Sequence, residues 1–248
     1  MSPGAGAAPK IEVLRVSKRF GTAAPVLREV GLECAENEFV CLLGRSGCGK
    51  TTLLNIIAGL VPPSSGEVRV DGERVTGPGR GKGMVFQQNA LFPWLTARGN
   101  IEFGARRSGL DKPAALRVAG ELLELVGLHA YADRYPGQLS GGMQQRVAIA
   151  RALALDPQIL LMDEPFGALD EITRLDMQAE LLRVWASRRK TVVFVTHSIM
   201  EALTLGDRVV VMGDGGIAAI HEIGLPRPRS RSDPALLRMH DAIWEGLH

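Results

Sequence analysis

Apolar residues along this chain occur either in short continuous runs or at helical spacing. Residues 39–43 and 191–196 are apolar or β-branched runs of strand length, and residues 159–162 form a third run that ends in two acids. Apolar side chains recur every three or four positions over residues 172–186. Strands that are apolar on both faces and alternate with helices call for a parallel sheet covered by helices. The pattern therefore predicts an α/β fold.

The remaining elements follow from turn and capping residues. Two apolar segments surround Glu36, Asn37 and Glu38, and we expect them to pair as a hairpin. We expect a helix over residues 50–60, with Gly59 as part of its stop signal. Residues 140–155 also have helical periodicity. Ser198 with Glu201 has the spacing of a capping box. Further strands are expected at residues 11–20, 67–70, 84–86 and 208–212, and further helices at residues 96–107 and 113–128.

These elements predict one large domain over residues 10–224, with an inserted all-helical part at about residues 88–145. Residues 1–9 are small residues and proline without the features of a secretion signal, and we expect a loose tail. Residues 225–248 form a C-terminal tail, in which Asp233 and Pro234 precede apolar residues at helical spacing. This helix either folds back on its own domain or makes a regulatory or dimer contact.

Composition narrows the class of protein. The 248 residues hold 29 Lys and Arg against 27 Asp and Glu, a formal net charge of +2. Without a basic block, nucleic acid is not expected as the main partner. No uncharged apolar stretch approaches the roughly 18 to 20 residues of a membrane span. Three cysteines without a C-x-x-C pair indicate reduced thiols rather than a zinc site.

A glycine-rich segment matches the pattern G-x-x-x-x-G-K-[ST] between a strand and a helix. It consists of Gly44, Arg45, Ser46, Gly47, Cys48, Gly49, Lys50 and Thr51. Backbone amides of such a loop surround phosphate at a helix N-terminus. Lys50 would reach the β- and γ-phosphates of ATP, Thr51 would ligate Mg²⁺, and Thr52 would donate to the α-phosphate. The alternative is a glycine-rich turn that binds nothing.

Two carboxylates, Asp163 and Glu164, follow the apolar run at residues 159–162. Acids at the end of a central strand are costly unless a cation uses them. Asp163 is expected to hold the Mg²⁺ shell, and Glu164 to accept a proton from the attacking water as general base. The alternative is that both acids cap the next helix.

A second potential anion site opens the helix that begins near residue 140. Ser140, Gly141 and Gly142 place a hydroxyl and two bare backbones at its N-terminus, with Gln144 one turn on. Here the chain resembles ATP-binding cassette (ABC) ATPases, whose signature motif is LSGGQ, with Met143 in place of the usual glutamine. The resemblance implies a P-loop (RecA-like) core with an N-terminal antiparallel β subdomain and an inserted α-helical subdomain. It also implies a homodimer in which one signature covers the γ-phosphate on the partner's P-loop.

Four further residues take their expected roles from this resemblance. Gln87 would touch Mg²⁺ and water, Asp170 would cross the dimer seam, and His197 would contact the γ-phosphate. Phe20 would stack on adenine. The structural alternatives are a surface amide for Gln87, a helix cap for Asp170, a structural histidine and a core phenylalanine. Members of this family commonly have an acidic residue after the histidine that corresponds to His197, the switch histidine, whereas this chain has Ser198.

The sequence Phe92-Pro93-Trp94-Leu95 places two aromatic residues just after Gln87. A mobile aromatic segment suits a partner's short helix, although core packing is the alternative. With residues 166–170 and 225–229 it resembles the nitrate, sulfonate and taurine importer branch. That resemblance implies an ATPase on the cytoplasmic face of a bacterial membrane, with permease subunits docking near residues 87–95 and a solute-binding protein as an indirect partner. A soluble nucleotide switch on nucleic acid or ribosomes and an exporter ATPase are the alternatives.

Overall fold

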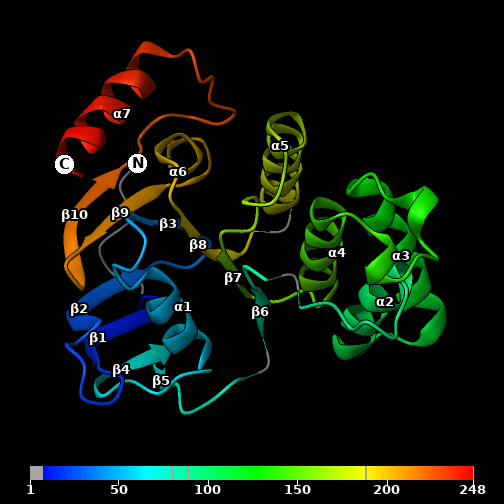
Figure 1. The fold of residues 1–248 in the computed structure, drawn as a ribbon, viewed down its shortest axis with the longest axis horizontal. Coiled ribbons are helices and arrows are strands. Elements are labelled where there is room, and N and C mark those ends of the chain that lie inside the picture. Colours follow the sequence, from blue (N-terminus) through cyan, green and yellow to red (C-terminus); the bar gives the residue numbers. More distant parts are fainter. Residues whose placement is uncertain (1–7, 80, 89, 188, 248) are drawn as a thin grey trace. The chain divides into compact units, whose positions relative to one another are not determined.

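A computed structural model describes residues 8–79, 81–88, 90–187 and 189–247. The chain forms two compact units, one of residues Met1–Gly79 with Lys190–His248 and one of residues Arg80–Arg189 (Figure 1). Most of the expected N-terminal tail, and Asn89 in the expected docking segment, lie outside the described residues.

The first unit contains an antiparallel sheet with the strand order β2-β1-β4-β5. Its strands are β1 (Ile11–Lys18), β2 (Leu27–Cys34), β4 (Ser65–Val70) and β5 (Glu73–Arg74). Ile11, Val13 and Val16 of β1 are buried. This sheet is the N-terminal antiparallel subdomain that the family resemblance implied.

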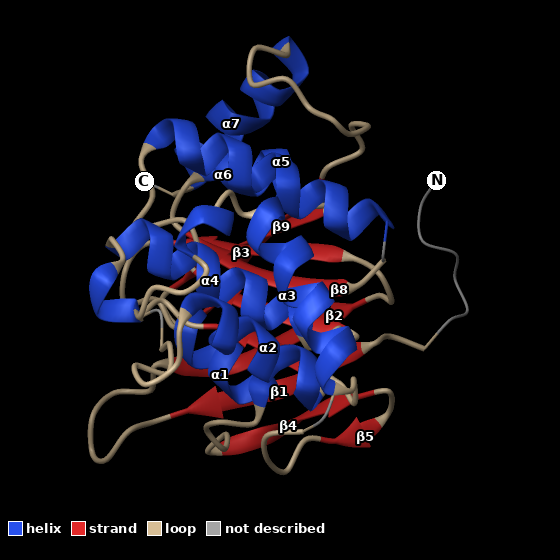
Figure 2. Cartoon of the chain, turned by 90° about the vertical axis from the view of Figure 1, so that its right-hand side faces the viewer, coloured by secondary structure: helices blue, strands red, loops and turns tan. Residues whose placement is uncertain are grey.

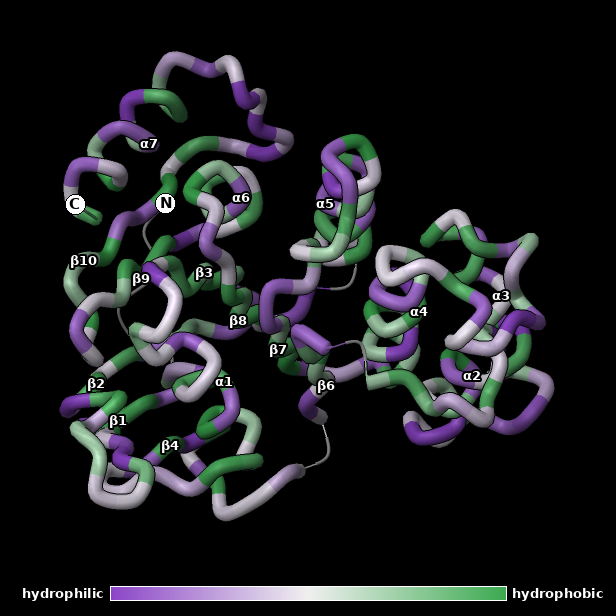
Figure 3. Tube along the Cα trace, in the orientation of Figure 1, coloured by the Kyte–Doolittle hydropathy of each residue, from purple (hydrophilic) through white to green (hydrophobic). Residues whose placement is uncertain are grey.

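Parallel strands form the rest of the first unit's core. Strand β3 (Phe39–Gly44) lies between β8 (Thr191–Thr196) and β9 (Arg208–Gly213) and is parallel to both. Every residue of β3 and β8 is buried, as a strand covered on both faces requires. Hydropathy follows the same division, with hydrophobic strands and more polar connections (Figure 3).

Helices of the first unit pack on these strands. Helix α1 (Lys50–Ala58) contacts β1, β3 and β8, and it ends at Gly59, whose φ of 81° is left-handed. Helix α6 (Ile199–Leu205) contacts β3, β8 and β9. Helix α7 (Pro234–Gly246) packs beside α6 (Figures 1 and 2).

The expected hairpin around Glu36 is wrong. Its two segments are β2 and β3, but β2 pairs with β1, whereas β3 pairs with β8 and β9. The reason is burial, because an uninterrupted apolar strand such as β3 needs neighbours that cover both faces. Strand β9 pairs instead with β10 (Gly216–Glu222) as a hairpin that the sequence pattern missed. Asp214 and Gly215 make its turn with φ of 48° and 81°, the left-handed pair typical of tight hairpins.

The second unit has two parallel strands and a group of helices. Strand β6 (Lys82–Val85) pairs with β7 (Ile159–Asp163). The helices are α2 (Ala97–Arg107), α3 (Lys112–Leu125), α4 (Gly141–Ala154) and α5 (Glu171–Ser187), with short 3₁₀ turns at His129–Tyr131 and Pro136–Gln138. Helix α2 packs against α3 and α4. A Cβ on Gly104 would lie 2.5 Å from the carbonyl oxygen of Arg151, so glycine permits the close approach of α2 to α4.

Among the described residues, we find no helix with both the length and the apolar character that crossing a bilayer requires.

Candidate functional site

The loop before α1 has the backbone geometry of a phosphate cradle. Gly47 and Gly49 have φ of 85° and 103°, a left-handed conformation that side chains other than glycine adopt only with strain. A Cβ on Gly49 would also lie 2.6 Å from Cδ2 of Leu27. Within the described chain, no side chain caps the start of α1. The first amides of this helix therefore point to a ready anion site.

Lys50 lies inside this cradle and is only 5% exposed. Its Nζ donates to the carbonyl oxygen of Gly44 at 2.7 Å and to that of Arg45 at 3.0 Å. A buried ammonium needs such partners, and phosphate oxygens are stronger acceptors than carbonyl oxygens. The lysine is thus held at the position from which it can turn to an incoming phosphate.

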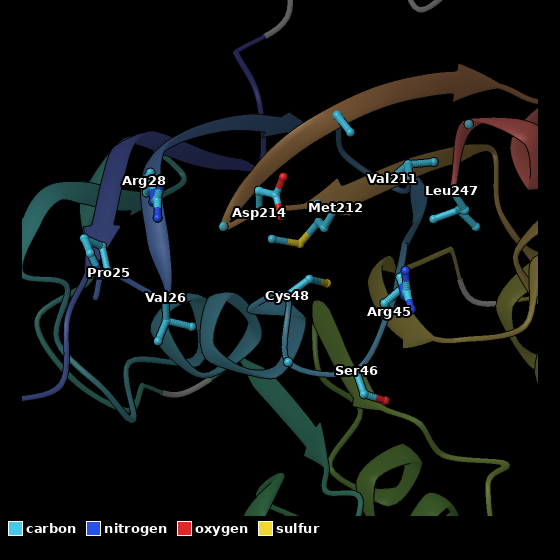
Figure 4. Close-up of a pocket in the computed structure, with 15 residues that line it drawn as sticks. Pro25, Val26, Arg28, Arg45, Ser46, Cys48, Val211, Met212, Asp214 and Leu247 are labelled. Atoms are coloured by element: carbon cyan, nitrogen blue, oxygen red, sulfur yellow. The ribbon is translucent and has the colours of Figure 1, made fainter. Parts of the chain in front are cut away.

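Residues 45–48 of the cradle line a cavity of about 920 Å³. This volume is sufficient for a nucleotide-sized molecule. Figure 4 shows Arg45, Ser46 and Cys48 along one side and Met212 and Asp214 of the β9–β10 hairpin along another.

Two other predicted residues of the first unit are exposed. His197 directly follows β8, and it lines a second cavity together with Gly44 and Arg45 of the cradle. Phe20 is 49% exposed, with Nζ of Lys18 at 4.9 Å from its ring centroid. Such exposure excludes the core-phenylalanine alternative. The ring is accessible for stacking on a planar ligand.

The start of α6 is held by a relay rather than by a simple capping box. Ser198 Oγ accepts from the amide of Glu201 at 3.3 Å, as the sequence predicts. The amide of Ser198 in turn donates to Oγ1 of Thr196 at 3.0 Å, and this hydroxyl donates to the buried Glu201 carboxylate at 2.6 Å. The relay fixes the backbone on both sides of His197.

In the second unit, the two acids at the end of β7 have different environments. Asp163 is 4% exposed, whereas Glu164 is half-buried. Glu164 has a left-handed φ of 45°, which is strained for a side chain of this kind. Strain of this type is concentrated at functional positions, where the surrounding fold must hold it.

The start of α4 has the predicted cap. Ser140 Oγ accepts from the amide of Met143 at 3.3 Å. The side-chain Nε2 of Gln144 donates to the carbonyl oxygens of Pro136 and Leu139, so this side chain supports the turn before the helix.

The two glycines that open α4 differ in the space around them. A Cβ on Gly141 would meet no atom within 4 Å, whereas one on Gly142 would lie 3.2 Å from Cδ2 of Leu169. Gly142 therefore packs against the segment that leads to Asp170, while Gly141 has an open side.

Asp170 caps α5, which is the structural alternative that the sequence left open for this residue. Its Oδ1 accepts from the amide of Thr173 at 3.0 Å. This hydrogen bond holds the pKa of the Asp170 carboxyl below its ordinary value. The residue is exposed, so a cap and a contact with another molecule are compatible.

Gln87 lies just beyond β6 and is exposed. The segment after it contains Phe92 and Trp94, which form an aromatic cluster with Phe103 of α2. The ring centroid of Phe92 lies 5.5 Å from that of Trp94 and 4.7 Å from that of Phe103. Trp94 is 70% exposed, so it does not belong to the core.

The sequence analysis missed Asn100, the residue that holds this segment. Asn100 is fully buried, and its Oδ1 accepts from the amide of Phe92 at 2.9 Å. Its Nδ2 donates to the carbonyl oxygens of Phe92, Leu95 and Thr96 at 3.0 to 3.2 Å. Arg151 adds a hydrogen bond to the carbonyl oxygen of Ala90. The available sequence signal was an asparagine inside the helical pattern of residues 96–107.

Comparison with known proteins agrees with this geometry. A family model described as ABC transporter matches residues 27–167. An uncharacterized ABC transporter ATP-binding protein of Methanocaldococcus jannaschii is 50% identical over 94% of this chain and 90% of its own length. The taurine import ATP-binding protein TauB of Mesorhizobium japonicum is 45% identical over 91% and 93%. The bicarbonate transport ATP-binding protein CmpD of Synechocystis is 47% identical over 96% and 89%.

Solved structures with the same fold are cassette dimers. The dimeric post-hydrolysis state of the ATP-binding cassette MJ0796 bound to ADP and Pi superposes with a TM-score of 0.80 at 36% identity, covering 87% of this chain and all of that one. These matches favour an importer ATPase over the soluble-switch and exporter alternatives. The chain belongs to the ABC transporter family and is an ATP-binding cassette ATPase.

Proposed function

We propose that this cassette binds MgATP at the loop of residues 44–51, pairs with a second copy, and powers a membrane importer for a small anion. The observation that carries the proposal is the cradle itself, with left-handed Gly47 and Gly49, an α1 N-terminus that no described side chain caps, and buried Lys50. In this proposal Gly44, Arg45, Ser46, Cys48 and Thr52 complete the phosphate site, and Phe20 stacks on the adenine ring.

The chemistry of hydrolysis is assigned to three residues that follow β6, β7 and β8 and to Lys50 at the start of α1. Glu164 accepts the proton of the attacking water, and its strained backbone presents the carboxylate beyond β7. Lys50 and His197 stabilise the charge that develops on the γ-phosphate. Gln87 orients the water.

The residues also fit a magnesium ion. Thr51 is an exposed hydroxyl in the first turn of α1, and Asp163 is a buried carboxylate, so both offer the oxygen ligands that Mg²⁺ prefers. Mg²⁺ commonly takes one or two protein ligands together with substrate phosphates. The ion would neutralise phosphate charge, and Gln87 would lie beside it.

A second copy supplies the other wall of the site. Ser140, Gly141, Gly142 and Gln144 of one protomer would cover the γ-phosphate bound by its partner, and Asp170 would lie at the seam. The open side of Gly141 supports this role, because a bare backbone allows phosphate to approach. The solved structures of the related cassette MJ0796 are dimeric, which supports a pair of copies.

The aromatic cluster after Gln87 is the proposed docking site for the permease. Its exposed Trp94 and Phe103 offer the apolar contact that a short helix of a membrane subunit needs. The cassette would thus act at the cytoplasmic face of a bacterial membrane, with a solute-binding protein as an indirect partner. Relatives named for taurine and bicarbonate support a small anion as the solute.

Glu164→Gln tests the ATPase assignment. Turnover should fall by about 10² to 10⁴ fold, the size of a lost general base, while ATP still binds. Glu121→Gln, an exposed acid of α3, is the matched control and should retain full activity. Unchanged turnover in Glu164→Gln would remove this residue from the mechanism. Uptake by vesicles that contain the permease, with taurine, sulfonate, nitrate or bicarbonate offered in turn, identifies the solute.

A further inference from the structure

The side chain of Arg151 joins helix α4 to the segment that follows Gln87. Its Nη1 donates to the carbonyl oxygen of Ala90 at 2.9 Å. Its guanidinium also lies over the ring of Phe92, 5.2 Å from the ring centroid. Burial lowers the pKa of Arg151 from its ordinary value, so the cation is partly withdrawn from water, where contacts of both kinds are stronger. One side chain of α4 therefore holds two positions of the segment.

The backbone at Ala90 is of the kind that needs an outside contact. Its φ of 44° is left-handed, which costs free energy for a residue that has a Cβ. Strained conformations persist only where the surrounding structure holds them. Asn100 holds the later part of the segment, since its hydrogen bonds run to Phe92, Leu95 and Thr96. The segment thus has two anchors, Asn100 on α2 and Arg151 on α4.

Helix α4 also carries the signature residues. It begins at Gly141, directly after the capping residue Ser140. Arg151 lies ten residues further along, which is about 15 Å at the rise of an α-helix. Rigid secondary elements can carry energetic coupling between distant sites. One helix therefore connects the signature, at its N-terminus, to the proposed docking site, near its C-terminus.

We propose that Arg151 is a positioning residue that couples permease docking to the signature end of α4. A membrane subunit that binds the aromatic cluster displaces Phe92 and Ala90, and Arg151 transmits this displacement to α4. The signature residues then shift relative to the γ-phosphate on a partner, which changes the rate of hydrolysis. This inference rests on the proposed function, because it needs both the docking site and the shared ATP site.

The expected effect of Arg151→Met is a loss of coupling rather than a loss of docking. Trp94 and Phe103 are exposed without help from Arg151, and Asn100 still anchors Phe92, so the membrane subunits should still bind. Coupling between two sites in a protein typically amounts to about 5 to 150 fold. We expect the ratio of ATP turnover with membrane subunits to turnover without them to fall by about fivefold or more.

The test uses the complex of the tagged cassette with its membrane subunits, purified and placed in vesicles. Arg151→Met should purify with as much membrane subunit as wild type, which would show that docking persists. Arg151→Lys keeps a cation near Phe92 and a donor for Ala90, and it should retain most of the ratio. Arg117→Met removes an exposed arginine of α3 and is the matched control, with a ratio like that of wild type.

A second measurement needs no membrane subunit. Coupling free energies are reciprocal, so ATP-driven pairing of two copies should act back on the docking segment. The chain has three tryptophans, so Trp185→Phe with Trp244→Phe leaves Trp94 as the sole emitter. In the Glu164→Gln background, MgATP should shift or quench this emission. Adding Arg151→Met should remove the response, while ATP-dependent dimerisation persists in light scattering.

The possible results are distinct. The coupling role alone would be overturned by a wild-type ratio in Arg151→Met, by failure of this variant to purify with membrane subunits, or by an Arg151→Lys variant coupled no better than Arg151→Met. A Trp94 emission that ignores ATP-driven pairing while Arg151 is present would overturn it too. A wild-type chain that does not hydrolyse ATP, or whose turnover does not respond to membrane subunits, would overturn the proposed function, and this inference with it.

Discussion

Gly141→Ala separates the folding role of the signature segment from its proposed role in a partner's site. Gly141 is the first residue of α4, and an added Cβ would meet no atom within 4 Å in this protomer. The substitution therefore creates no clash inside the folded chain. Its methyl group instead occupies the space through which a partner's γ-phosphate would reach the backbone.

The substitution should leave the free energy of unfolding unchanged or raise it slightly, whereas it should lower the rate of ATP turnover. Alanine in a helix is favoured over glycine by roughly 0.5 to 1 kcal/mol, so the free energy of unfolding should be unchanged or slightly higher. Hydrogen bonds from a backbone amide to a phosphate oxygen need about 2.9 Å, which a methyl group on that face prevents. Loss of one such donor in a site that stabilises charge costs about 10² to 10³ fold in turnover.

The assay combines three measurements on the purified variant. ATP binding to the protomer's own cradle should persist, since Gly47, Gly49 and Lys50 are unchanged. ATP-dependent dimerisation, measured by light scattering in the Glu164→Gln background, should be lost. Gly120→Ala is the matched control, because this glycine lies within α3 and its Cβ would also meet nothing within 4 Å.

Retained dimerisation and wild-type turnover in Gly141→Ala would refute the proposed role of this residue at a shared site. A large drop in thermal stability would instead show that the space beside Gly141 is not open as the structure has it.

Further predictions test other parts of the chain. Alkylation at pH 8 should modify Cys48 in the cradle and be blocked by ATP, as followed by mass spectrometry. Cys34 should stay unmodified, because burial raises its pKa to about 12 and the thiol remains protonated at pH 8. Asn100→Ala should lower the free energy of unfolding by about 1 to 3 kcal/mol in a urea titration and abolish stimulation by the permease, while basal ATPase activity persists. Arg229→Met should lower the free energy of unfolding in a urea titration, because the carbonyl oxygens of Leu203 and Gly206 lose their donor, and an unchanged midpoint would contradict this.

Most strands and helices were predictable because their signals are local. The uninterrupted apolar runs at β3, β7 and β8 and the helical spacing in α5 each follow from a few neighbouring residues. The cap of α7 at Asp233 was visible for the same reason, and its carboxylate accepts from the amide of Ala235 at 2.8 Å. Pairing of β2 was mispredicted, because a strand's partner depends on burial far along the chain.

The sequence alone determined which chemistry this chain carries. The order and spacing of residues 44–51 and 139–146 are set by the covalent chain, so these motifs can be recognised without knowledge of the fold. Only the tertiary structure decided what surrounds those residues. It placed His197 and two residues of α7, His240 and Trp244, around one cavity. It also held the segment of Trp94 through Asn100 and left one side of Gly141 open. Contacts of this kind join positions that are distant in the sequence, and the open space beside a glycine depends on which other residues the fold brings near it. Neither can be predicted from a local sequence pattern.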